Sequence, residues 1–334
     1  MELIELLQQL AAAFGPSGSE AGIRSCIETL VEPFADDVKT DTMGNLIVHK
    51  KGNGPRMMFS AHMDSIGMIV THIEENGWLR FGALGGLEQL DLRRQSVIFA
   101  NGTRGVLGVP EDKEEEGSIK LTDLYIDIGA ASREEAQKMV KLGDSCVYDA
   151  PFWTQNDKVF SKYLDNRSGC ALLISALAQI KNPKNDLYFV FSVQEEVGVR
   201  GVRPAAFGVA PDIGIAVDVT CSDDLPGSTH CCSAVLGKGS AVKLKDGSVI
   251  CQPEVVNWMN AVAANHGIAV QQDVLRSGGT DAGGLLTSRM GVYTGGICVP
   301  CRYTHAPIEV CDLNDIESGV RFAVALAESE FVVS

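Results

Sequence analysis

The stretch FVFSVQEEVGVRG, residues 189–201, ends a run of strand-forming residues with two adjacent glutamates, Glu195 and Glu196. Adjacent residues of a strand point to opposite faces, so both side chains serve one site only if the strand ends near Gln194. In a parallel α/β sheet, ligands bind at the carboxyl ends of the strands. The stretch therefore predicts an α/β fold with both carboxylates in a crevice above the sheet. The alternative is a solvated acidic loop or the first turn of a helix.

The sequence on both sides of this stretch alternates between helical and strand patterns, which is typical of α/β proteins. Near-continuous apolar runs predict strands buried on both faces at residues 56–62, 187–193, 213–218 and 291–298. Apolar residues recur three and four positions apart in helices predicted at residues 1–14, 20–34, 167–180, 253–267 and 312–331. Candidate helix caps are Ser17 or Ser19 and Asp312 or Asn314. We therefore expect an α/β fold with a mostly parallel mixed sheet sandwiched by helices.

The pattern changes between residues 66 and 159, where short alternating β-like runs are broken by glycine. This composition predicts an inserted β-rich domain of residues 66–159 within a discontinuous α/β domain of residues 1–65 and 160–334. The acidic run EDKEEEG, residues 111–117, is expected to be a solvated loop, with an assembly or gating role as the alternative.

Composition and charge exclude several classes of protein. The formal net charge of −15 argues against nucleic acid as a partner, because affinity for phosphate backbones depends on basic groups. No apolar run approaches the roughly 20 residues of a membrane span, so no membrane partner is expected. The acidic start of the chain predicts an amphipathic helix rather than a signal peptide, and the ten cysteines lack a regular spacing. We expect reduced thiols and a cytoplasmic protein.

Histidines and carboxylates also occur at other predicted strand and helix ends: His62, Asp64, Asp165, Asp218 and His305. Two imidazoles and several carboxylates suit zinc, cobalt or manganese. Asp64 leaves an extended chain on the same side as His62, and a carboxylate beside a histidine commonly orients the ring for metal binding. The number of candidates suggests two ions that share one carboxylate, with a further carboxylate available to accept a proton from water.

Six motifs carry a resemblance to a known family: SAHMDSIG, YLDNRSGC, SVQEEVGVRG, AVDVT, RSGGTDAGG and RYTHAPIEV. In this order and spacing they resemble the M42 family of metallo-aminopeptidases, the tetrahedral aminopeptidases, over essentially the whole chain. The resemblance implies a zinc-peptidase-like α/β domain with a β-barrel-like dimerisation domain inserted in it. It also implies a dodecamer with an internal chamber that admits short peptides with a free N-terminus.

The resemblance assigns roles to individual residues. Asp165 would bridge two divalent ions, and the peptide bond after it would be cis. The remaining ligands would be His62 and Asp218 at one ion and Glu196 and His305 at the other. Asp64 would orient His62, and Glu195 would be the general base that takes a proton from a water between the metals.

Other interpretations of the same residues stay open. A carboxylate pair alone could serve a glycoside hydrolase, and a chain that kept the fold could be a non-catalytic assembly component. The glycine-rich RSGGTDAGG could shape the substrate cleft, with Asp281 as a supporting residue. Cys298 and Cys301 form a C-x-x-C that could be redox-active, zinc-binding or incidental. The lack of a basic residue in residues 218–228 favours neutral aliphatic residues at the substrate's N-terminus.

Overall fold

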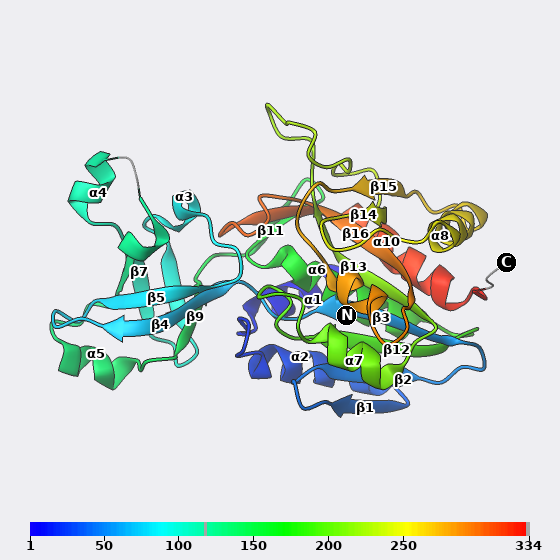
Figure 1. The fold of residues 1–334 in the computed structure, drawn as a ribbon, viewed down its shortest axis with the longest axis horizontal. Helices are drawn as coiled ribbons and strands as arrows, with labels where there is room; N and C mark the ends of the chain where they lie inside the picture. The colour runs from blue at the N-terminus through cyan, green and yellow to red at the C-terminus, as the bar shows by residue number, and fades with distance from the viewer. Residues whose placement is uncertain (117–118, 332–334) are drawn as a thin grey trace.

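The computed structural model of the protein describes residues 1–116 and 119–331, and its elements form a large α/β body and a smaller β-barrel (Figure 1). The barrel is built from one continuous part of the chain, which leaves the α/β body after strand β3 and returns to it at strand β10. None of the helices in these ranges is long and apolar enough to cross a membrane.

The α/β body is organised by one large sheet with the strand order β1-β2-β12-β3-β13-β16-β17-β11-β10. Its central strands, which run parallel, are β12 (Asp186–Ser192), β3 (Arg56–His62), β13 (Ile213–Cys221) and β16 (Tyr293–Arg302). The other strands are β1 (Asp37–Thr40), β2 (Leu46–Lys50), β10 (Trp153–Gln155), β11 (Lys158–Ser161), β14 (Ala241–Lys245), β15 (Gln271–Val274) and β17 (Glu309–Asp312). Strands β14 and β15 lie outside this order: β14 pairs with β16, and β15 pairs with β14.

The prediction of a mostly parallel sheet holds at the centre and is wrong for the sheet as a whole. Among the described strands, four neighbouring pairs are parallel and six are antiparallel. The reason lies in the connections at the edges. Strands β1 and β2 are joined by residues 41–45, and β10 and β11 by residues 156–157. Such short connections form hairpins, whereas a parallel pair needs a crossover of a dozen or more residues.

Helices cover both faces of the sheet. One face packs against α1 (Leu3–Ala12), α2 (Ala21–Val31), α6 (Leu164–Gln179), α8 (Pro253–Asn265) and α10 (Leu313–Ala327). The other packs against α7 (Val202–Val209) and α9 (Asp281–Leu286). Along β3, Met57 and Phe59 enter the first core and Met58 enters the second. This alternation explains why the central strands read as unbroken apolar runs.

Some predicted boundaries agree with the structure and others differ from it. Strand β3 spans the predicted residues 56–62, whereas β13 continues to Cys221 instead of ending at Asp218. The cap expected of Asp312 is present, because its carboxylate accepts a hydrogen bond from the Asn314 N–H. The cap expected of Ser17 or Ser19 is wrong, because Glu20 occupies the N-cap position of α2 and the Ser17 hydroxyl donates to Asp64 instead.

The barrel is closed by strands in the order β4-β5-β8-β7-β6-β9. Their bounds are β4 (Gly67–Ile73), β5 (Leu79–Leu84), β6 (Ser96–Phe99), β7 (Arg104–Gly108), β8 (Tyr125–Asp127) and β9 (Ser145–Tyr148). The barrel has its own core, in which Met68, Val97, Leu107 and Ile126 are buried. Among the described residues, three α-helices lie beside it: α3 (Gln89–Leu92), α4 (Glu111–Glu116) and α5 (Arg133–Met139).

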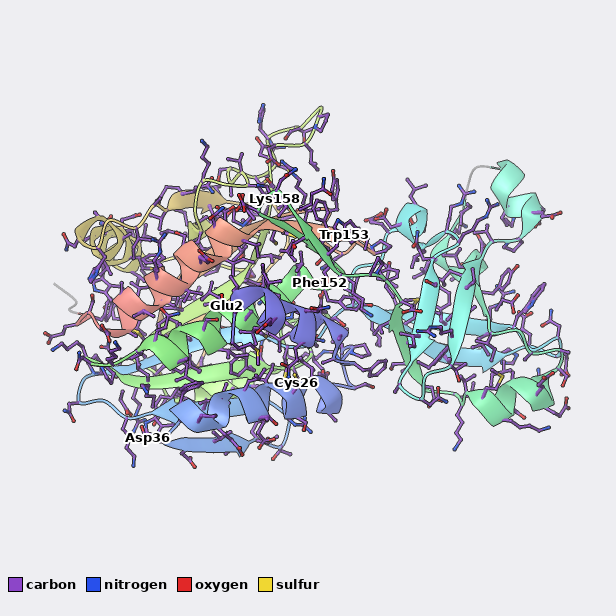
Figure 2. All side chains as sticks on the ribbon, turned by 180° about the vertical axis from the view of Figure 1, so that it is seen from behind. Glu2, Cys26, Asp36, Phe152, Trp153 and Lys158 are labelled. Carbon is purple, nitrogen blue, oxygen red and sulfur yellow. The ribbon has the colours of Figure 1, made fainter. Side chains whose placement is uncertain are left out.

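Two details of the predicted insertion differ from the structure. Strand β10 and the start of β11 fall within residues 66–159 but pair in the large sheet; Figure 2 labels Trp153 and Lys158 on this hairpin. The division of the chain into domains at residues 65 and 160 stays a prediction. The acidic run is not simply a loop, because residues 111–116 form α4, and acidic side chains in a first turn suit the helix dipole. Gly117 lies outside the described residues.

Candidate active site

A cavity of about 600 Å³ opens at the carboxyl ends of the central parallel strands. Six of the seven predicted site residues line it: His62, Asp165, Glu195, Glu196, Asp218 and His305. The seventh, Asp64, is fully buried and contacts the backbone of the two glutamates. Segments that are up to 243 residues apart in the chain thus meet at one edge of the sheet, as ligand sites in α/β proteins generally do.

The ends of the strands determine where these side chains lie. His62 is the last residue of β3, and the two glutamates follow the end of β12 through Gln194, whose φ of 54° turns the chain out of the sheet. Asp218 lies within β13, two residues beyond Ala216, the last residue that pairs with β3. Asp165 is at the start of α6, and His305 follows β16 in the loop to β17.

The ligand atoms form two groups that share Asp165. In the first, His62 Nε2 lies 3.1 Å from Asp165 Oδ1 and 3.5 Å from Asp218 Oδ1. In the second, His305 Nε2 lies 3.4 Å from Asp165 Oδ2 and 3.1 Å from Glu196 Oε2. Each oxygen of Asp165 therefore faces a different group. In both groups, the ligand atoms lie within 4.8 Å of one another.

Glu195 differs from its neighbour, because its carboxylate belongs to neither group although it lines the same cavity. The structure also contains the cis peptide bond between Asp165 and Asn166 that the resemblance implied. The Asn166 side chain donates a hydrogen bond of 2.8 Å to the Val217 carbonyl, which ties the start of α6 to β13 beside Asp218.

Burial and close charges shift the pKa values of the site. Burial raises the pKa of Asp218 to about 7, although His62 opposes the shift. Burial lowers the pKa of His305, but the carboxylates of Asp165 and Glu196 raise it more, to about 12. Burial also raises the pKa of Glu195 well above its usual value. Such shifts, concentrated in a cleft, are typical of functional sites.

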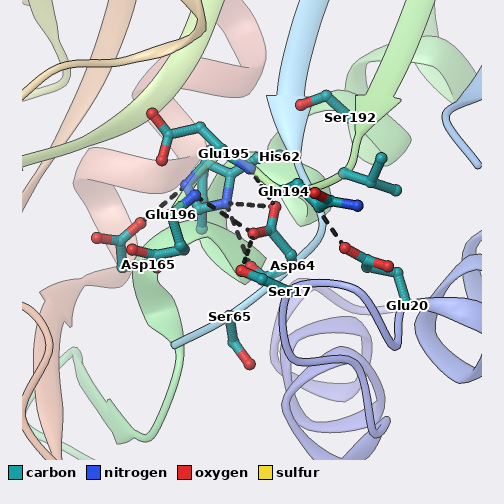
Figure 3. Close-up of polar contacts among 12 residues, drawn as sticks. Ser17, Glu20, His62, Asp64, Ser65, Asp165, Ser192, Gln194, Glu195 and Glu196 are labelled. Atoms are coloured by element: carbon teal, nitrogen blue, oxygen red, sulfur yellow. Dashed lines mark hydrogen bonds and ion pairs between the residues drawn. The ribbon is translucent and has the colours of Figure 1, made fainter. Parts of the chain in front are cut away.

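Asp64 holds both glutamates through their backbone (Figure 3). Its Oδ1 accepts the N–H of Glu195 at 3.0 Å, and its Oδ2 accepts the N–H of Glu196 at 3.3 Å and the Ser17 hydroxyl at 2.6 Å. His62 Nδ1 lies 3.2 Å from the Asp64 carbonyl oxygen and 3.5 Å from the Asp64 carboxylate. The aspartate therefore contacts the imidazole and holds the loop that carries the glutamates, and its role in orienting His62 stays a prediction.

Glu309 is a second buried carboxylate of this kind, and the sequence interpretation gave it no role. It is 1% exposed, and it accepts the N–H of Asp165 at 2.9 Å and the N–H of His305 at 2.7 Å. The only sequence signal was an acidic residue in the apolar context PIEVC, four residues after His305. A carboxylate that acts through backbone amides leaves no ligand spacing to recognise.

Asp281, expected as a supporting residue, lies beneath the site. It is 1% exposed, and its Oδ2 accepts the hydroxyl groups of Ser60 and Ser192, which lie on the neighbouring strands β3 and β12. These contacts tie together the two strands that deliver His62 and the glutamates.

The residues present fit divalent cations. Three carboxylates and two imidazoles surround two points, which is a donor set of the kind that binds zinc, cobalt or manganese. Glu196 Oε1 is buried and has no hydrogen-bond partner among the described residues. Because a buried carboxylate oxygen without a partner is costly, this atom indicates a ligand for a cation.

Comparison with known proteins finds similarity over nearly the whole chain. The model of the M42 glutamyl aminopeptidase family matches residues 44–322. A relative from Acetivibrio thermocellus is 44% identical over 97% of this chain and 98% of its own. The lysyl aminopeptidase of Pyrococcus furiosus is 36% identical over 97% of this chain and 96% of its own.

A solved structure of the Pyrococcus horikoshii TET1 peptidase superposes on this chain with a TM-score of 0.87. The two are 34% identical, and the match covers 98% of this chain and 99% of that one. The TET1 peptidase is described as assembling into a tetrahedron or a large octahedral shell. The match to the family model, the relatives over nearly their full length and the shared fold lead to one conclusion. The chain belongs to the M42 family of aminopeptidases.

Proposed function

We propose that the protein is a metal-dependent aminopeptidase with two divalent cations per chain, which removes N-terminal residues from short peptides. The observation that carries the two-metal assignment is the position of Asp165, whose two oxygens face two separate groups of ligand atoms. His62 and Asp218 would complete one cation site, and Glu196 and His305 the other. Zinc, cobalt and manganese all suit this donor set.

The proposed chemistry separates the two glutamates. When bound, two such cations activate a water for attack and polarise the scissile carbonyl. Glu195 lines the cavity without belonging to either ligand group, so its carboxylate is available as a general base. It would accept the proton of the attacking water and pass it to the leaving amine. A raised pKa, which burial gives Glu195, suits a group that must both accept and return a proton.

The cavity also bears on substrate preference. Among the described residues that line it there is no lysine or arginine, whereas Glu88 adds a carboxylate beyond the proposed ligands and base. An acidic N-terminal side chain would therefore find no cationic partner there. This argues against an acidic N-terminal residue. A panel of aminoacyl anilides with zinc, cobalt or manganese would measure the expected preference for neutral aliphatic residues.

The assembly and the place of action are part of the proposal. Self-association into dimers and then a dodecamer, with the barrel as the dimerisation domain, is supported by the likeness to the tetrahedral TET1 peptidase. The barrel exposes large apolar side chains that a partner could cover, including Leu90 and Leu142 at 81% and 64% exposure. A closed shell would admit peptides and exclude folded proteins, which fits late peptide breakdown in the cytoplasm.

Two substitutions test the assigned roles. Glu195→Gln is expected to keep both metals and lose at least about 100-fold in kcat, because it removes the proton acceptor and no ligand. Asp165→Ala is expected to lose metal as well as activity, since both sites share this residue. Metal content by mass spectrometry and turnover of a leucyl anilide distinguish the two variants.

Three results would count against these roles. A Glu195→Gln enzyme with near wild-type turnover would refute the assigned base, and an Asp165→Ala protein with full metal content would refute the shared ligand. Hydrolysis of a glycan substrate that survives complete chelation would favour a carboxylate-only glycosidase.

A further inference from the structure

The loop that carries the glutamates is held by side chains rather than by a neighbouring strand. Four consecutive backbone N–H groups, those of residues 193–196, donate hydrogen bonds to buried side-chain oxygens. The Val193 nitrogen lies 3.0 Å from Asn45 Oδ1, and the Gln194 nitrogen lies 3.2 Å from Glu20 Oε1. The nitrogens of Glu195 and Glu196 lie 3.0 Å from Asp64 Oδ1 and 3.3 Å from Asp64 Oδ2, respectively. The three accepting residues are between 0% and 6% exposed.

This part of the loop needs external support because its backbone is unfavourable. Strand β12 ends at Ser192, so the next residues have left the ladder of strand hydrogen bonds. Gln194 has a φ of 54°, in the left-handed region that is unfavourable for a non-glycine residue. Such a conformation persists when the surroundings determine it by several contacts.

The N-terminal segment, residues 15–20, supports two of these four hydrogen bonds. It supplies the acceptor of one and contacts Asp64, the acceptor of another. Glu20 Oε1 accepts the Gln194 N–H and also the Gly18 N–H at 2.7 Å. The Ser17 hydroxyl donates to the same Asp64 oxygen that accepts the Glu196 N–H. Figure 3 shows Ser17 beside Asp64 and Glu20 beside Gln194.

The N-terminal segment is itself fixed in place. Pro16 forms a β-bridge with Ser65, next to Asp64 in the chain, and the Ser65 N–H donates to the Gly15 carbonyl at 3.1 Å. The Arg167 guanidinium, fully buried, lies 3.5 Å from the same carbonyl oxygen. Gly15 packs so closely on Ile23 that an added Cβ would lie 2.3 Å from its Cγ2, so the segment is tied to α2.

We infer that the N-terminal segment positions the carboxylates of Glu195 and Glu196, and that Ser17 and Glu20 are positioning residues of the active site. The inference rests on the proposed function for its effect on turnover, because Glu195 is the proposed base. Its structural part stands on the hydrogen bonds alone: without Ser17 or Glu20, the amides of residues 194–196 lose part of what holds them. Displacement of a base by a fraction of an ångström slows catalysis, while substrate can still enter the cavity.

The test combines amide exchange with kinetics on the full-length protein. In Ser17→Ala and Glu20→Ala, the amides of residues 194–196 are expected to exchange with deuterium at least about tenfold faster than in the wild type. The kcat for a leucyl anilide, measured with zinc in excess so that both metal sites stay filled, is expected to fall about tenfold or more, the usual scale for removing support from a metal site, with KM and metal content within about twofold. A purely structural loss would lower active protein and metal content together.

Matched variants make the result specific. Ser17→Thr keeps a hydroxyl donor and Glu20→Gln keeps an oxygen acceptor, so both are expected to restore slow exchange and turnover. Ser19→Ala is the control, because the Ser19 hydroxyl lies 3.5 Å from Ser145 on the side of the barrel. Unchanged exchange in both alanine variants, or faster exchange with unchanged kcat, would overturn the inference. A wild-type protein without peptidase activity would instead refute the proposed function, and the exchange data would still decide whether the segment holds the amides.

Discussion

At the scale of single residues, the site depends on buried carboxylates that bind backbone amides as much as on the proposed ligands. Asp64 accepts the N–H groups of both adjacent glutamates, and Glu309 accepts those of Asp165 and His305. Carboxylates that accept such charge-assisted hydrogen bonds hold a backbone more firmly than neutral acceptors do. Asp64 therefore fixes the loop that carries the glutamates, and Glu309 fixes two segments that meet at the cavity.

Glu309→Gln tests this arrangement from the side of the metals. The amide keeps one acceptor oxygen, but its NH₂ group then faces a backbone N–H, so one of the two hydrogen bonds is lost. We expect metal affinity to fall about 10- to 100-fold, the range typical for residues that support metal ligands. Titration with zinc measures it, with Glu317→Gln on the exposed side of α10 as the control. Equal zinc affinity in the Glu309→Gln and control variants would contradict the assigned role.

Residue spacing predicted which side chains meet at the cavity, because histidines and carboxylates at the ends of parallel strands converge on one edge of the sheet. It could not predict Glu309 or the use of Ser17, because both act on backbone atoms of segments that are distant in sequence. Ser17 was interpreted as a helix cap, the commonest local use of a serine before a helix. Tertiary contact with Asp64 takes the place of that local bond.

At the scale of elements, the loop after β13 borders the cavity and is tied to β16 by an ion pair. Arg302 donates two hydrogen bonds to Asp224, at 2.8 and 2.6 Å, and Ser222 donates a third at 2.7 Å. Cys231, farther along this loop, lines the cavity. The pair therefore fixes a segment that shapes the space for substrate.

This pair predicts a pH-dependent contribution to stability. Hydrogen bonds from Arg302 hold the pKa of Asp224 at about 2, below its ordinary value near 4. Because the folded-state pKa is the lower one, the stabilisation is present above pH 4 and is lost as the pH falls towards 2. With side chains 23% and 30% exposed, we expect about 1 to 2 kcal/mol at pH 7 after allowing for solvent screening.

Chemical unfolding of the wild type and of Asp224→Asn at pH 7 and pH 3 measures the effect. The difference in unfolding free energy is expected to shrink at the lower pH, while Asp112→Asn, at an exposed position of α4, gives a difference that does not change. A difference for Asp224→Asn that is as large at pH 3 as at pH 7 would rule out the ion pair as its source.

The elements themselves were predictable where one physical signal dominated. Continuous apolar runs gave the central strands, because helices bury both faces of that part of the sheet. The antiparallel edges were not predictable from such runs, since β10 and β17 are short and their pairing follows from hairpins and from contacts distant in sequence. The acidic helix α4 was missed because charge runs are usually solvated loops.

At the scale of the whole molecule, the barrel projects from the α/β body (Figure 1). It also carries exposed apolar side chains. Leu90 and Leu142 are exposed large apolar side chains of the barrel. The TET1 peptidase, whose fold this chain shares, assembles into closed shells. Assembly would set which substrates reach the cavity.

Sedimentation velocity tests the assembly. We expect a species of about twelve chains, and cleavage of short peptides but not of folded proteins by that species. A stable monomer or dimer with full activity would show that no enclosed chamber is required for activity.

The central claim is that two divalent cations bind on either side of Asp165 while Glu195 stays free, and anomalous diffraction from crystals grown with zinc tests it most directly. We predict two peaks per chain, about 3.5 to 4 Å apart, one beside His62 and Asp218 and the other beside Glu196 and His305. A single peak, or zinc coordinated by the Glu195 carboxylate, would contradict the account.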